Sequence, residues 1–198
     1  VLGAGTNRLN KYNVRRVTRA LAKYILTTPD GAQKGVAIAY DSRRKSTEFA
    51  RAAALVLCAA GVKVFLFESL RPVPVLSFTV RHLKCIAGIV ITASHNPAQY
   101  NGYKVYWTDG AQMPPESVKG ITERLPDTTY AESLPMDEQE ALDKGLLTYI
   151  GKDVDDAYIA AIKKLAVNPE LTREMGQTLK IVYTPLHGSG NIPVRRML

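Results

Sequence analysis

Short apolar runs alternate with helical stripes along most of the chain. Residues 36–40, 62–67 and 86–91 are compact apolar runs of the length expected of buried strands. Residues 46–60 and 73–83, which separate these runs, repeat apolar side chains at helical spacing. Strands that alternate with helices in this way predict a layered α/β fold in which neighbouring strands are largely parallel.

The pattern extends towards both ends of the chain. A helix is predicted from Asn13, because one apolar stripe repeats at helical spacing as far as Ile25. Further elements are predicted after the third strand: strands at 103–107, 146–150 and 179–183, and helices at 114–124, 136–144 and 152–166. We therefore expect a three-layer α/β/α arrangement around a mixed, largely parallel sheet.

The composition is that of a globular protein. The 198 residues are 46% hydrophobic and 22% charged, and no apolar run approaches the roughly 20 residues that cross a bilayer. The start of the chain carries no charged-then-apolar leader, so we expect a cytoplasmic protein that engages no membrane. Cys58 and Cys85 lie in apolar segments and are predicted to be buried free thiols.

The net charge of +8 raises the question of which anions the protein binds. Nucleic acid would suit such a charge. The lysines and arginines are, however, spread among the predicted helices, without a basic tract or a patch interleaved with aromatic residues. A positive surround also steers small anionic substrates, and an acidic remainder of the protein would balance the charge. We favour these two explanations together and expect no nucleic acid partner.

A loop after the third predicted strand carries the candidate chemistry. Asn-Pro and Asn-Gly pairs mark residues 92–102 as a turn-rich connection. The loop contains Ser94 and His95, and Lys104 follows Ser94 by ten residues. A hydroxyl at the end of a buried strand, with an imidazole and an ammonium close in sequence, is a candidate phosphoryl acceptor. Loops held by a rigid sheet commonly carry such chemistry.

This loop resembles a known active-site motif. Thr-Ala-Ser-His-Asn-Pro at 92–97, followed by Tyr-Asn-Gly-Tyr-Lys at 100–104, is similar to the serine loop of the α-D-phosphohexomutases, the phosphoglucomutase/phosphomannomutase family. The resemblance implies that Ser94 is carried as a phosphoserine. It would give its phosphoryl group to a sugar phosphate and take another back from the resulting bisphosphate.

The resemblance also implies catalytic roles for His95 and Lys104. A serine hydroxyl must lose its proton to a base before it becomes a strong nucleophile, and either residue could serve. We favour Lys104 for proton transfer or charge neutralisation, and His95 for orienting the phosphoserine.

A second motif adds a cation to the predicted site. Tyr-Asp-Ser-Arg at 40–43 resembles another signature of the family, whose arginine reaches the active site. Arg43 is therefore a candidate substrate-binding residue, and a loop-stabilising pair with Asp41 is compatible with that role. Arg43 together with Asn96 and Asn101 makes up the substrate-binding set that the resemblance implies.

The resemblance implies two cofactors. A magnesium ion is expected on the phosphate of Ser94, because a divalent cation neutralises that charge, and a sugar bisphosphate is expected as activator. The family's other magnesium ligands form an Asp-x-Asp-x-Asp loop, which this sequence lacks, together with the sugar-recognition loop and the terminal phosphate-binding domain. We therefore expect the chain to be inactive alone and to work on sugar phosphates with the remaining domains of a longer chain.

The same resemblance suggests a domain boundary. Residues 1–167 would form the family's first domain. Residues 168–198 would be a linker and the truncated beginning of a second, similar domain, because Thr-Pro-Leu-His-Gly-Ser-Gly-Asn at 184–191 resembles its opening. His187 in this run is interpreted as a structural residue.

Other classes of protein fit these residues less well. A serine hydrolase usually places glycines around its nucleophile in a Gly-x-Ser-x-Gly turn, and Ser94 lacks them. A non-catalytic α/β domain that keeps the mutase fold is the main rival. Within the family, a phosphopentomutase-like member is an alternative to a phosphoglucomutase or phosphomannomutase.

Overall fold

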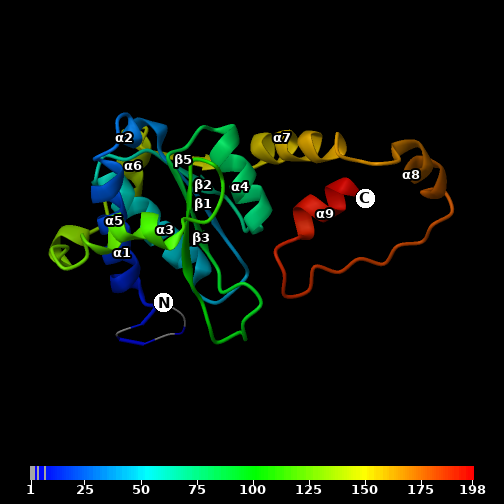
Figure 1. Ribbon diagram of the computed structural model, residues 1–198. Helices are drawn as coiled ribbons and strands as arrows, with labels where there is room; N and C mark the ends of the chain where they lie inside the picture. Colours follow the sequence, from blue (N-terminus) through cyan, green and yellow to red (C-terminus); the bar gives the residue numbers. More distant parts are fainter. Residues whose placement is uncertain (1–2, 4, 7) are drawn as a thin grey trace.

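A five-stranded sheet lies at the centre of the molecule (Figure 1). The computed structural model describes residues 3, 5–6 and 8–198. The strands are β1 (Val36–Tyr40), β2 (Val64–Phe67), β3 (Ala87–Ile91), β4 (Tyr103–Trp107) and β5 (Leu147–Ile150). The helices are α1 (Lys11–Ile25), α2 (Gly31–Lys34), α3 (Ser46–Ala59), α4 (Val73–His82), α5 (Pro115–Thr122), α6 (Glu138–Asp143), α7 (Lys152–Lys163), α8 (Pro169–Met175) and α9 (Asn191–Met197), with a 3-10 turn at Ala131–Ser133.

The sheet is mixed and mostly parallel, as the sequence predicts. Its strand order is β4-β3-β1-β2-β5. Strand β1 is parallel to both of its neighbours, β2 and β3, and β5 is parallel to β2. Only β4 pairs antiparallel, on the outer side of β3. This arrangement leaves β1 and β3 side by side with their carboxyl ends at the same edge of the sheet.

Helices cover both faces of the sheet. Val36, Ile38 and Tyr40 of β1 pack into a core with α1 and α3, whereas Ala37 and Ala39 pack into a second core with α4 and α7. Because both faces are buried, successive strand residues are all apolar instead of alternating with polar ones. The predicted α/β/α layering is therefore confirmed.

A buried ion pair anchors α7 to the body of the domain. Arg71, in the turn before α4, is 1% exposed. Its Nε and Nη2 atoms donate to the two carboxylate oxygens of Asp155 at 2.9 and 2.8 Å, in the forked geometry that favours arginine at such positions. The backbone amide of Arg71 donates to the carbonyl of Tyr40 at 3.0 Å, which joins the turn to the end of β1.

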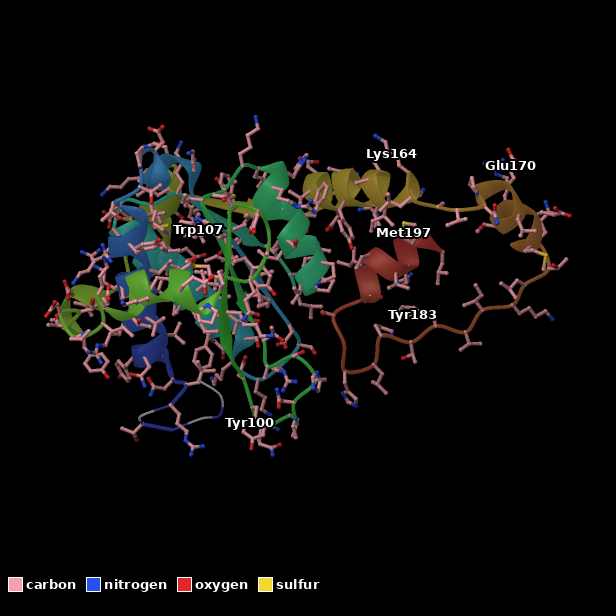
Figure 2. All side chains as sticks on the ribbon, viewed as in Figure 1. Tyr100, Trp107, Lys164, Glu170, Tyr183 and Met197 are labelled. Atoms are coloured by element: carbon pink, nitrogen blue, oxygen red, sulfur yellow. The ribbon has the colours of Figure 1, made fainter. Side chains whose placement is uncertain are left out.

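Beyond α7, the chain runs away from the sheet and returns. Figure 2 shows Lys164 after α7, Glu170 on α8 and Tyr183 on the extended run that leads back towards α9. Helix α9 packs against α7, where Arg196 forms an ion pair with Asp156. None of the helices in the described part of the chain is long and apolar enough to cross a membrane.

The strand predicted at residues 179–183 was wrong. These residues are extended but form no sheet ladder, and Val182 is fully exposed. A strand is stabilised by backbone hydrogen bonds to a neighbouring strand, and the extended run lies outside the sheet of the domain. The apolar pattern at 179–183 predicts a strand, but it does not show whether a neighbouring strand is present to pair with it.

Candidate active site

The loops after β1 and β3 meet at the carboxyl edge of the sheet. Strand β1 runs into residues 41–45, and β3 runs into residues 92–102. The amide of Asp41 donates to the carbonyl of Ile91 at 3.1 Å, so pairing continues one step past the strands. Crevices at the carboxyl ends of adjacent parallel strands are where open α/β sheets bind ligands.

Arg43 stabilises the loop at residues 92–102, called the serine loop below, by hydrogen bonds to its backbone. Its guanidinium donates to four backbone carbonyls of that loop: Ser94 at 2.8 Å, Asn96 at 2.6 Å, and Pro97 and Tyr100 at 2.9 Å each. The side chain is 13% exposed. The rigid fork of five donors makes this possible, so Arg43 determines the course of the loop. Figure 2 shows Tyr100 near the far end of this loop.

Asp41 accepts hydrogen bonds from both loops. Its carboxylate accepts from Ser46 Oγ at 2.7 Å, from Thr92 Oγ1 at 2.6 Å and from Arg43 Nε at 3.1 Å. The predicted pair between Asp41 and Arg43 is therefore present. Thr92 Oγ1 in turn accepts the amide of Ser94 at 3.0 Å, so the carboxylate orients the hydroxyl that positions Ser94.

Ser94 is exposed at the point where the loop turns outward. Its backbone is left-handed, with φ of +59°, a conformation that costs a non-glycine residue about 1 kcal/mol or more. The bonds from Thr92 and Arg43 maintain it. The result is a hydroxyl that faces solvent, with its Oγ 3.3 Å from Nδ1 of His95.

A hollow of about 640 Å³ surrounds this hydroxyl. Its lining includes Ser94, His95, Asn96, Arg43, Arg44 and His187. The first five come from the loops after β1 and β3. His187, which the sequence interpretation treated as structural, reaches the same hollow from the far end of the chain.

The other predicted site residues occupy different positions. Asn101 is 7% exposed, and its amide nitrogen donates to the carbonyl of Arg44 and to Ser46 Oγ at 3.1 and 2.8 Å. These contacts favour a structural role for Asn101, which stabilises the loop. The sequence had instead predicted that Asn101 contacts the substrate. Lys104 lies on β4 and lines another cavity, of about 510 Å³, between β4, α1 and α5.

Asn96 both stabilises the loop and lines the hollow. Its side-chain nitrogen donates to the carbonyl of Ala93 at 2.7 Å, which closes the turn after Ser94. The residue also lines the hollow. The predicted group of Ser94, His95, Arg43 and Asn96 is thus brought together around one cavity.

Two supporting residues, Thr92 and Ser46, were not identified as part of the site from the sequence. Both donate to the carboxylate of Asp41, Thr92 from the loop after β3 and Ser46 from the start of α3. A local signal for Thr92 exists, because threonine hydroxyls often accept the amide two residues on. Ser46 is the first residue of α3, and its contact with Asp41 depends on the turn between them.

The described residues contain no ready-made cluster of metal ligands. Among the described residues, no three His, Cys, Asp or Glu side chains are grouped so that they could hold a metal ion. Both oxygens of Asp41, the acid of the hollow, already accept hydrogen bonds from Thr92, Ser46 and Arg43.

The arrangement suits an anionic ligand. An exposed serine hydroxyl stands beside an imidazole at the end of β3, and Arg43 and Arg44 line the same hollow. Electropositive hollows at the carboxyl edge of an α/β sheet bind phosphate-bearing molecules. The fold and the site therefore define an α/β protein whose serine loop opens onto a hollow lined by two arginines.

Comparison with known proteins identifies the family. Residues 2–132 match the family model described as phosphoglucomutase/phosphomannomutase, alpha/beta/alpha domain I. The chain is 35% identical over 197 residues to a human phosphopentomutase, covering 96% of this chain and 32% of the relative. It is 37% identical over 194 residues to a phosphoglucomutase of Staphylococcus haemolyticus, covering 97% of this chain and 34% of the relative.

A solved structure agrees with these matches. A putative phosphomannomutase from Thermus thermophilus superposes with a TM-score of 0.67 at 30% identity, over 83% of this chain and 34% of that one. The chain therefore belongs to the phosphoglucomutase/phosphomannomutase family, which confirms the resemblance seen in the sequence. It spans about a third of the length of these relatives.

Proposed function

We propose that this chain is the serine-bearing part of a phosphosugar mutase, in which Ser94 carries the phosphoryl group that is exchanged with the sugar. The observation that supports this most strongly is the conformation of Ser94. Its exposed hydroxyl faces the hollow from a left-handed backbone that Arg43 and Thr92 maintain. Such strain is retained where the surrounding structure over-determines it, commonly at functional sites.

The proposed reaction has two transfers. In the first, a sugar hydroxyl attacks phosphorus on Ser94, the bond from phosphorus to Oγ breaks, and Oγ takes up a proton. The sugar is then a bisphosphate. In the second, Oγ gives up that proton and attacks the phosphorus of the other phosphoryl group. The bond from that phosphorus to the sugar oxygen breaks, the sugar oxygen takes up a proton, and the isomeric monophosphate is left. Positioning and electrostatic stabilisation do most of the work in such transfers.

The contacts suggest how this chain's residues share that work. His95 Nδ1 lies 3.3 Å from Oγ, slightly beyond ideal hydrogen-bond distance, and such contacts often tighten when substrate binds. His95 is thus well placed to hold the proton of Ser94. Lys104 remains the sequence-based candidate for proton transfer or charge neutralisation. Arg43 acts mainly by positioning, because its donors are used by the loop carbonyls.

The complete site requires more than this chain. We propose that further domains of the same longer chain supply the remaining magnesium ligands and the sugar-binding residues, and that a sugar bisphosphate serves as activator. The share of the relatives that this chain spans supports this. Exposed apolar side chains at Leu179, Ile181 and Val182 also support it, because apolar residues are normally covered.

The substrate class and compartment are proposed on the same basis. Relatives are named phosphopentomutase and phosphoglucomutase, so pentose and hexose phosphates are both candidate substrates. Cys58 and Cys85 are free and buried, which is compatible with a reducing cytoplasm. A non-catalytic domain that keeps the fold is the alternative, and Ser94 would then carry no phosphate.

Intact-mass analysis tests the proposal. The longer chain proposed above, which contains these residues, is purified and incubated with glucose 1,6-bisphosphate, and we expect one phosphoryl adduct, mapped to Ser94 by peptide sequencing. Ser94→Ala should abolish the adduct, whereas Ser117→Ala, a matched change on α5, should retain it. If the wild-type chain takes up no phosphoryl group, or if the adduct survives in Ser94→Ala, the proposal fails.

The expected inactivity of the isolated chain has its own assay. Glucose 1-phosphate and its bisphosphate are added, and isomerisation is followed. We expect no turnover, because the magnesium ligands and sugar-binding residues lie in other domains. Isomerisation at a rate typical of complete enzymes, which is on the order of 10 per second, would refute this.

A further inference from the structure

The far end of the chain forms one side of the hollow around Ser94. His187, Gly188 and Ser189 line it together with the loops after β1 and β3. We infer that this segment is a second wall of the phosphate site and that His187 binds the phosphoryl group held at Ser94. The inference rests on the proposed function for the identity of the ligand, and it adds a binding residue to that site.

A direct hydrogen bond joins this wall to the residues that order the serine loop. Ser42 Oγ donates to the carbonyl of His187 at 3.1 Å, across 145 positions of sequence. Ser42 lies between Asp41 and Arg43, the two residues that bind Thr92 and the carbonyls of the serine loop. The position of His187 is therefore coupled to the hydrogen bonds that present Ser94.

The backbone of His187 is unusual in the same way as that of Ser94. His187 has φ of +62° and Ser94 has φ of +59°. Left-handed conformations are uncommon for residues other than glycine, although histidine is among those that tolerate them. Glycine would adopt this turn without cost, and Gly188 is the next residue. A histidine is therefore held at this position despite the cost of its backbone conformation.

The returning segment is held from its other side as well. Helix α9, which follows the loop, packs against α7, and Arg196 forms an ion pair with Asp156. Helix α7 is in turn anchored through the buried pair of Arg71 and Asp155. The segment around His187 thus has contacts on both sides, at Ser42 and at α7.

The charges of the hollow favour a phosphoryl group. Arg43, Arg44, His95 and His187 line it, and its acid, Asp41, is satisfied by hydrogen bonds from both loops. Imidazole carries an N–H donor in either protonation state. An imidazole donor in this wall of the hollow is the contact that we infer for a phosphoryl oxygen on Ser94.

The histidine content allows a clean test with inorganic phosphate as the probe. The chain has three histidines, so NMR resolves three imidazoles. His82, on α4 and stacked on Phe78 with ring centroids 5.1 Å apart, serves as the internal control. We expect the signals of His95 and His187 to shift with phosphate along one saturation curve, while the signal of His82 stays in place.

Substitutions of His187 separate the contribution of its imidazole to phosphate binding from that of its backbone conformation. His187→Ala should weaken phosphate binding by about tenfold or more, the effect of losing one hydrogen bond to a charged group. His187→Gly, which relieves the left-handed backbone, should show the same loss. His187→Asn tolerates this backbone and keeps a donor, so it should recover part of the affinity. His82→Ala should bind as the wild type does.

Two outcomes would overturn the inference. In the first, the NMR signal of His187 does not shift when phosphate is added until the shift of His95 saturates or phosphate reaches its solubility limit. The second is wild-type affinity in His187→Gly. If Ser94 still accepts a phosphoryl group from the bisphosphate in either case, the proposed function stands and only the role of His187 falls. If Ser94 accepts none, the proposed function fails separately.

Discussion

Replacing Arg43 with lysine tests how the serine loop is held. The guanidinium donates to four loop carbonyls, and a single ammonium cannot reach all of them. Two of these bonds, to Asn96 and Tyr100, are partly buried. At about 1.5 kcal/mol net for each such charge-assisted bond, Arg43→Lys should favour the open loop by about 3 kcal/mol, roughly a hundredfold in its population.

Native-state hydrogen exchange measures this population directly. The amides of Ser94, Asn96 and Tyr100 donate within the loop, at 3.0, 3.1 and 3.0 Å. Their exchange should accelerate about a hundredfold in Arg43→Lys, while the amides of β1 exchange as in the wild type. Arg44→Lys, a matched change at the exposed neighbouring position, should leave the loop amides protected.

A contrary result has a clear meaning. If the loop amides of Arg43→Lys exchange at the wild-type rate, the carboxylate of Asp41 and the local turns suffice to hold the loop. The reasoning that assigns its course to the guanidinium would then be refuted. Loss of protection throughout β1 as well would show that Arg43 supports the whole domain.

Three further predictions concern burial and charge. Asp155→Asn leaves Arg71 buried without its carboxylate and should lower the free energy of unfolding, measured in urea, by about 3–5 kcal/mol; a change below about 1 kcal/mol would contradict it. Burial raises the pKa of Cys58 and Cys85 to about 12, so neither thiol should react with a disulfide reagent near pH 8 until the protein unfolds; rapid reaction of the native protein would be inconsistent with that burial. Hydrogen bonds from the lysine of its own helix and from the arginine of α9 lower the pKa of Asp156. Because the folded pKa lies below the unfolded value, this contribution is present above about pH 4 and is lost as the pH falls through the folded pKa. Exchange of the α9 amides, corrected for intrinsic rates, should therefore rise in acid, and Asp156→Asn should show the rise already at neutral pH.

The sequence by itself determined the layered fold and its family. The patterns at 36–40 and 103–107 predicted strands with the observed bounds. The run at 36–40 is apolar throughout because β1 is buried on both faces. The helical stripe up to Ile25 predicted α1, which begins two residues earlier than expected because Asn10 caps it. The loop from Thr92 to Lys104 was long and distinctive enough to indicate the family, which the comparisons then confirmed.

Only the tertiary structure decided which residues meet. Asn101 and Lys104 belong to the same motif as Ser94, yet one is buried beneath the loop and the other lines a different cavity. His187, which stood apart in the sequence, lies at the hollow. The physical reason is that periodicity reports which side chains avoid water, one element at a time. A binding site instead depends on where loops from distant strands converge, and on which donors and acceptors remain open once hydrogen bonds within the protein have formed.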